Sequence, residues 1–150
     1  MHRALQIVEA VATALRANTS LLAEVYPYRV RSMDESEQEL PAVLVRIGAD
    51  TPNADSGQSS LSFIDSIQEV LIEALARGDS EQEIIETLLE LHTQIHVALQ
   101  ANVTLGLSFV TDTRYAGADA PEISDAADRY SGRIITRWSV LYRAVFTNPS

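Results

Sequence analysis

The sequence predicts a single α+β domain in which a mostly antiparallel β-sheet is flanked by two main helices. Three observations support this prediction. Apolar residues near the N-terminus and over residues 80–99 recur with the period of an amphipathic helix. The last patterned stretch alternates polar and apolar residues, as a half-buried strand does. The chain has 150 residues, of which 46% are hydrophobic and 21% charged, and this is enough for one ordinary core.

The N-terminal segment is expected to hold a helix, a strand and a polar loop. Apolar residues spaced three or four positions apart predict a helix over residues 2–17. Alternation over residues 26–32 predicts a first strand. Residues 34–39 contain no apolar side chain, which favours a loop.

The next segment is expected to continue the sheet. A compact apolar run over residues 42–47 predicts a second strand, and the residues of 48–57 predict a loop, so that the two strands and the loop fit a meander. Residues 60–75 fit both a strand and a helical stripe. We favour a strand because three acidic residues of the segment share one parity: Asp65, Glu69 and Glu73.

The second half is expected to contain the main helix and the closing strands. Ser80 and Glu83 form a capping-box pair that predicts the start of a helix over residues 80–99. Residues 105–115 are expected to form a strand, and residues 116–129 a connector rich in Gly, Ala and Asp.

The final strand is the strongest signal in the chain. It runs from Arg133 to Phe146 with period two, which over fourteen residues predicts a length of about 45 Å. Such a strand reaches past the core of a small domain, and this favours pairing with other strands or chains. Its apolar face is expected to consist of Ile134, Thr136, Trp138, Val140, Tyr142, Ala144 and Phe146.

Two missing residue types exclude several kinds of chemistry. The chain has no cysteine and no lysine, and all eleven basic residues are arginines. It therefore has no disulfide, thiolate nucleophile or cysteine-bound metal. It also has no lysine for a phosphate-binding loop or a Schiff base.

Acidic residues are concentrated in the middle of the chain. The net charge is −10, and residues 34–101 hold fourteen acidic residues against two arginines. A surface of this sign repels phosphate backbones, so specific binding of nucleic acid is not expected. The acidic surface candidates are Asp34, Glu35, Glu37, Glu39, Glu81, Glu83, Glu86 and Glu90.

Two motifs resemble metal sites only in part. His92 and His96 have the spacing of two zinc ligands on a helix, but Thr93 occupies the position of a catalytic glutamate. Residues 53–57 resemble a calcium loop in which the glycine comes one place early. We expect no metal and no cofactor at either place.

Charged residues near the C-terminus are candidates for contacts with a neighbouring subunit or another partner. Three arginines share the polar face of the final strand, and a neighbouring subunit's acidic residues could pair with them. These interface candidates are Arg133, Arg137 and Arg143. The connector carries Asp119, Glu122, Asp125 and Asp128, which favours either simple solvation or ordering against a partner that bears arginines.

The order of elements resembles that of tail terminator proteins of long-tailed bacteriophages. The resemblance covers nearly the whole chain, residues 1–150, as one such domain. It rests on the strand LPAVLV at residues 40–45, on Leu105-Gly106-Leu107 after the helix, and on the closing strand RWSVLYR at residues 137–143.

This resemblance implies a structural protein of the virion without catalytic residues, made in the host cytoplasm. It implies a ring, most simply a hexamer, at the head-proximal end of the tail tube. Such a ring stops tube polymerisation and contacts both the tail tube protein and the head connector or stopper. DNA would pass through without specific binding. The channel would be lined either by the acidic residues of 34–39 or by those of 79–90. No membrane is involved.

Three other functions stay open at this stage. The chain could be another neck component, such as a head–tail adaptor or stopper. It could be a small metal-dependent hydrolase that uses His92 and His96. It could also be a monomeric ligand-binding domain.

Overall fold

A computed structural model describes the chain except for residues 1, 22, 28–40, 53–62, 125–129 and 146–150. It is an α+β domain, as predicted. The elements are α1 (Arg3–Ala17), β1 (Glu24–Pro27), β2 (Ala42–Pro52), β3 (Phe63–Gly78), α2 (Glu81–Gln100), β4 (Val110–Ala118), β5 (Glu122–Ser124) and β6 (Tyr130–Val145). No helix in the described ranges is both long and apolar enough to cross a membrane.

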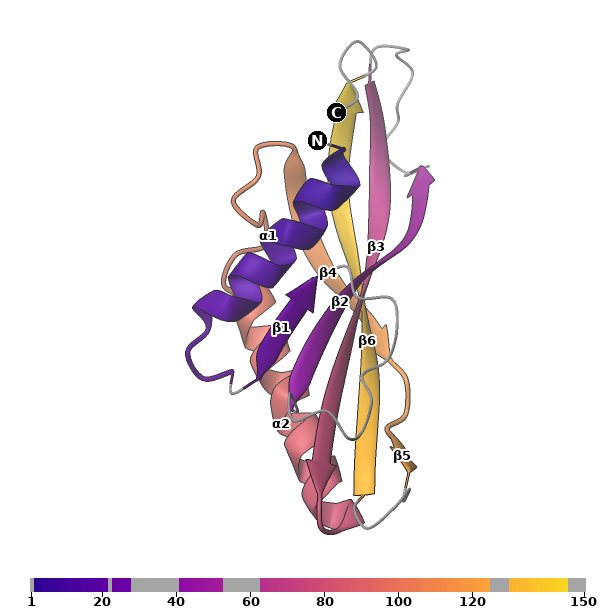
Figure 1. Cartoon of the computed structure of the whole chain (residues 1–150). Coiled ribbons are helices and arrows are strands. Elements are labelled where there is room, and N and C mark those ends of the chain that lie inside the picture. Colours follow the sequence, from indigo (N-terminus) through magenta and orange to yellow (C-terminus); the bar gives the residue numbers. More distant parts are fainter. Residues whose placement is uncertain (1, 22, 28–40, 53–62, 125–129, 146–150) are drawn as a thin grey trace.

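The strands form one sheet in the order β1-β2-β3-β6-β4, and β5 also pairs with β6. All pairs are antiparallel except β1 with β2. The long strands β3 and β6 pair from Phe63 opposite Val145 to Gly78 opposite Tyr130. Both helices lie on the same face of the sheet, and the domain is elongated along these two strands (Figure 1).

The core lies between the two helices and this face of the sheet. α1 contributes Ile7, Val11 and Leu15, and α2 contributes Ile84, Leu88 and Ile95. The predicted apolar face of the final strand is confirmed from Ile134 to Tyr142, where every second residue is buried. The side chains of the last two residues of that face lie outside the described part.

Both predicted helices are confirmed, and so is the capping box. The backbone N–H of Glu83 donates to Ser80 Oγ at 3.2 Å, and Glu83 Oε2 accepts from the backbone N–H of Asp79 at 3.1 Å. These contacts satisfy donors that a helix start otherwise leaves unpaired.

The strand prediction for residues 60–75 is confirmed, since β3 covers all of it that is described. Asp65, Glu69 and Glu73 indeed share a parity and lie on the face opposite the helices. The final strand is also confirmed, and it begins three residues earlier than expected.

The predicted meander is wrong, because β1 pairs with β2 in parallel. Residues 28–41 separate the two strands, and a connection of that length allows the chain to return to the end at which β1 began. The predicted continuation of the first strand over residues 28–32, and the loop over residues 34–39, lie outside the described part.

The predicted loop over residues 48–57 is wrong in its first half. β2 continues to Pro52 after a register shift between Ile47 and Asp50. Gly48 makes this possible, because a Cβ there would lie 2.6 Å from Glu69 Oε1 and 2.9 Å from its Cβ. Residues 53–57 lie outside the described part.

The predicted boundaries after α2 are also wrong. Residues 101–109 form turns, with Leu105 and Gly106 at φ of 55° and 69°, so the strand begins only at Val110. The expected connector contains the end of β4 and all of β5. Pairing with the long strand β6 stabilises these short strands, which have little apolar pattern of their own.

Candidate interaction surfaces

The face of the sheet opposite the helices carries the charged residues predicted as contacts. We call it the open face, because no helix of the described part lies on it (Figure 1). Apolar and charged residues alternate across β3 and β6: Leu71 lies opposite Arg137, Glu73 opposite Ile135, and Asp65 opposite Arg143. This face is amphiphilic. Four of its apolar residues are half-buried: Ile67, Leu71, Ile135 and Leu141. Ala42, Leu44 and Leu75, on the same face, form a separate buried cluster.

A buried carboxylate lies near the middle of the open face. Glu73 is 1% exposed and lies next to two arginines: Arg46 Nη2 is 2.5 Å from Glu73 Oε2, and Arg133 Nη1 is 3.6 Å from Glu73 Oε1. Arg133 also contacts the exposed Glu122 at 2.7 Å. These two guanidinium groups compensate a charge that burial would otherwise make very costly.

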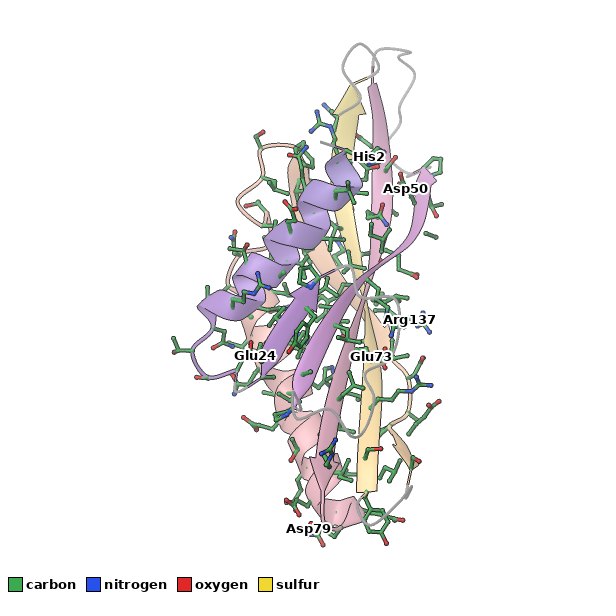
Figure 2. The ribbon with its side chains drawn as sticks, viewed as in Figure 1. His2, Glu24, Asp50, Glu73, Asp79 and Arg137 are labelled. Carbon is green, nitrogen blue, oxygen red and sulfur yellow. The ribbon has the colours of Figure 1, made fainter. Side chains whose placement is uncertain are left out.

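The other two predicted arginines also have carboxylate partners within the chain. Arg137 Nη2 lies 3.0 Å from Asp119 Oδ2, and Arg143 Nε lies 2.7 Å from Asp65 Oδ1. The hydrogen bond from Arg143 lowers the pKa of Asp65. Figure 2 shows Arg137 extending from the sheet on the side away from the helices.

These pairs change the interpretation of the acidic connector. Asp119 and Glu122 do contact arginines, but the arginines belong to the chain's own β6. Asp125 and Asp128 lie outside the described part. The β6 arginines therefore do not need an external partner to compensate their charge, although they do lie together on the open face.

The outer surface of α2 is acidic, and the helix contains no arginine. Glu81, Glu83, Glu86 and Glu90 are all exposed. Glu86 accepts from Gln82 at 3.0 Å, and Glu90 accepts from Gln94 at 2.8 Å, so these partners are neutral. Asp34, Glu35, Glu37 and Glu39 lie outside the described part.

The same helix exposes large apolar residues, which the sequence analysis missed. Ile85 is 37% exposed, Leu89 47% and Val97 54%. Ile85 and Leu89 lie one turn apart, and Val97 lies about 80° further round the helix than Leu89. The helical pattern contains this signal, since these positions fall outside the buried stripe. Arg46 was missed as well, because sequence spacing does not place β2 beside Glu73.

The histidine pair packs against aromatic rings. The ring centroid of His96 lies 5.2 Å from that of Tyr115 and 5.3 Å from that of Trp138. The ring centroid of His92 lies 5.6 Å from that of Tyr115. Burial lowers the pKa of His92, and His96 lowers it further. No group of three potential metal ligands occurs among the residues that the structure describes.

Beside His96, the buried Trp138 begins a short series of hydrogen bonds in the core. Trp138 Nε1 donates to Thr136 Oγ1 at 3.0 Å, and Thr136 Oγ1 donates to the Ile72 carbonyl at 3.2 Å. Further along β6, Tyr142 donates to Asp50 Oδ2 at 2.8 Å. Burial and this hydrogen bond raise the pKa of Tyr142 to about 12. The Thr136 bond thus links β6 to β3, and the Tyr142 bond links β6 to β2.

The fold is similar to that of a chain in the "Virion of native gene transfer agent (GTA) particle". The TM-score is 0.50 at 15% sequence identity, and the match covers 90% of this chain and 94% of that one. The likeness therefore shows a shared fold. No family model matches the chain, and no curated protein matches its sequence.

Proposed function

We propose that this chain is a structural protein of a phage-like virion, with a role in assembly and none in catalysis. The observation that carries the proposal is the fold shared with a chain of the gene transfer agent virion. The match covers nearly all of both chains, so the likeness involves the whole domain and not one common motif.

Within such a particle, we infer the role of a tail terminator for the whole chain, residues 1–150. Six copies would form a ring at the head-proximal end of the tail tube. The ring would stop polymerisation of the tube protein and join the tail to the head connector or stopper. The order of elements, which resembles that of this family, supports the assignment. The sheet supports it too, because one face packs against the helices and the open face carries charged and apolar residues that a neighbour could contact.

The acidic residues fit a channel through which DNA passes without binding. A ring repeats each charge once per subunit, and the exposed glutamates of α2 have no arginine beside them on the helix: Glu81, Glu83, Glu86 and Glu90. Lined by these residues or by Asp34, Glu35, Glu37 and Glu39, the channel wall would repel the phosphate backbone.

The arginines of β6 are the proposed contacts between subunits: Arg133, Arg137 and Arg143. Each already has a carboxylate partner in its own chain. A guanidinium has five N–H donors, however, so one group can bind two carboxylates. In this proposal the intrachain pairs orient the arginines, and the neighbouring subunit adds a second acidic partner.

The deciding experiment is the mass of the purified chain by light scattering, followed by electron microscopy with isolated tail tubes. We expect six times the monomer mass of 16.4 kDa, or rings that form only at one tube end. Rings that bind an isolated head connector but not tubes would instead indicate a head–tail adaptor or stopper. A strict monomer that binds neither would reject the assembly role.

A further inference from the structure

The outer surface of α2 has the chemistry of a docking surface. Ile85 and Leu89 are exposed apolar residues one turn apart, with Glu86 and Glu90 beside them, and Val97 is a third exposed apolar residue about 80° further round the helix than Leu89. Neighbouring exposed apolar residues bordered by charge are found at contact sites. We call these five residues the α2 ridge.

The open face has a matching pattern at its centre. Along β6, Ile135 and Leu141 flank Arg137, and Leu71 of β3 lies opposite Arg137. We call these four residues, with Ile67, the sheet patch. All four apolar members are half-buried, so they already lose part of their contact with water within one chain.

The two surfaces have similar lengths. Ile85 and Val97 are twelve residues apart on a helix, which corresponds to about 18 Å at 1.5 Å per residue. Ile135 and Leu141 are six residues apart on a strand, which corresponds to about 20 Å. In a helix laid along the long strands, Ile85 and Leu89 can face the patch together, whereas Val97 lies at the edge of the contact because it is about 120° further round the helix than Ile85.

The charges of the two surfaces are complementary. α2 carries acidic residues and no arginine, whereas the centre of the sheet patch carries Arg137. The Arg137 contact with Asp119 uses Nη2 and leaves the side chain 39% exposed. Glu86 or Glu90 of another molecule could approach this guanidinium, and their present glutamine partners are neutral.

We propose that the α2 ridge of one copy docks on the sheet patch of the next copy. The helices and the open face lie on opposite sides of one sheet (Figure 1), so the two docking surfaces point in opposite directions. Such a contact is heterologous, and it closes into a ring when the rotation per subunit divides a full turn. This inference rests on the proposed function in requiring self-assembly, and it identifies the surfaces that assemble. Because Glu86 and Glu90 would then lie in the contact, it assigns the channel wall to the other acidic residues, Asp34, Glu35, Glu37 and Glu39.

Cysteine cross-linking tests this contact directly, because the native chain contains no cysteine. The test variant combines Leu71→Cys with Leu89→Cys, and the probe is a short bis-maleimide. A head-to-tail contact links each copy to the next, so we expect a ladder of covalent dimers, trimers and higher species. Each single variant should stay monomeric on a denaturing gel.

A matched control combines Leu71→Cys with Thr13→Cys. Thr13 is exposed on α1, on the same side of the sheet as α2, and should give no ladder. Dimers from Leu89→Cys alone would indicate a helix-to-helix contact, and dimers from Leu71→Cys alone a sheet-to-sheet contact. Either result, or the absence of any cross-link, would overturn the proposal.

Charge exchange gives a second, independent readout in the cysteine-free chain. Glu86→Arg and Arg137→Glu should each weaken association by about tenfold, and together they should restore most of it. Glu9→Arg on α1 is the control that should change little, alone or with Arg137→Glu. An exchange pair no stronger than its single variants would also contradict the contact.

The outcomes separate this contact from the proposed function. If the wild type forms rings on tail tubes but gives no ladder, the contact is wrong and the terminator role survives. If the ladder forms but no ring binds a tube or a connector, the contact holds and the terminator role fails.

Discussion

Removing the buried charge of Glu73 tests how much its ion pairs with Arg46 and Arg133 contribute to the free energy of unfolding. Glu73→Gln keeps the shape of the side chain but leaves Arg46 and Arg133 without the carboxylate between them. Breaking a fully buried ion pair costs about 3–5 kcal/mol. The side chains of Arg46 and Arg133 remain 25% and 39% exposed, so water recovers part of this. We expect a loss of about 2–3 kcal/mol in the free energy of unfolding.

The matched control is Glu122→Gln, which removes the other carboxylate partner of Arg133. Glu122 has a side chain that is 67% exposed, so this loss should stay below about 1 kcal/mol. Urea unfolding at one fixed protein concentration measures both. With a slope of about 2 kcal/mol per molar, Glu73→Gln should lower the midpoint by about 1–1.5 M.

A second variant tests the reason for the loss. If the cost arises from a guanidinium left without its counter-charge, then adding Arg46→Met to Glu73→Gln should recover part of the stability. Equal midpoint shifts for Glu73→Gln and Glu122→Gln would refute the reasoning. They would mean that burial adds nothing to the strength of this network.

Three further predictions concern the packing of α2 and β6. Gly132→Ala would place a Cβ 2.5 Å from Cγ2 of the buried Ile84, so overpacking should cost about 1–3 kcal/mol in urea unfolding. Thr136→Val leaves the buried indole N–H of Trp138 without an acceptor and should cost about 1–3 kcal/mol, with a shift in the emission of this single tryptophan. Because the folded state lowers the pKa of His92, its contribution to stability is complete above about pH 6.5 and is lost as the pH falls below that value. The urea midpoint should therefore fall between pH 7.5 and 5.5, and less so in His92→Gln.

Each of these predictions has a result that contradicts it. An unchanged midpoint for Gly132→Ala would show that Ile84 moves aside at no cost. For Thr136→Val, equal losses with and without Trp138→Phe would show that the indole bond contributes nothing. For His92, an identical pH dependence in wild type and His92→Gln would assign the effect to other groups.

The sequence predicted the elements that carry a strong period and missed those formed by pairing. α2 and β6 have long amphipathic patterns, and both were predicted, α2 to within one residue at each end and β6 with a start three residues too late. β5 has three residues and no pattern of its own, and it exists because β6 lies beside it. The parallel pairing of β1 with β2 depends on a long connection between them. The alternation of residues within each strand does not indicate the direction of its partner, so the pairing could not be predicted from it.

The candidate surfaces were predictable in composition but not in pairing. Alternation placed three arginines on one face of β6, and that face is the open one. Which carboxylates meet them depends on the register between β3 and β6 and on the course of the chain through β4 and β5. Periodicity does not specify either, so partners such as Asp65 and Asp119 could not be foreseen.

One register determines both the core and the proposed assembly surface. Alternate residues of β6 enter the core or lie on the open face, so a slip of one residue would exchange Trp138 with Arg137. The same slip in β3 would move the charge of Glu73 to the helix side, away from Arg46 and Arg133. The buried network thus opposes the wrong register strongly. A variant that weakens it, such as Glu73→Gln, should therefore reduce assembly through the sheet patch as well as stability, although Glu73 itself is too buried to contact a neighbour.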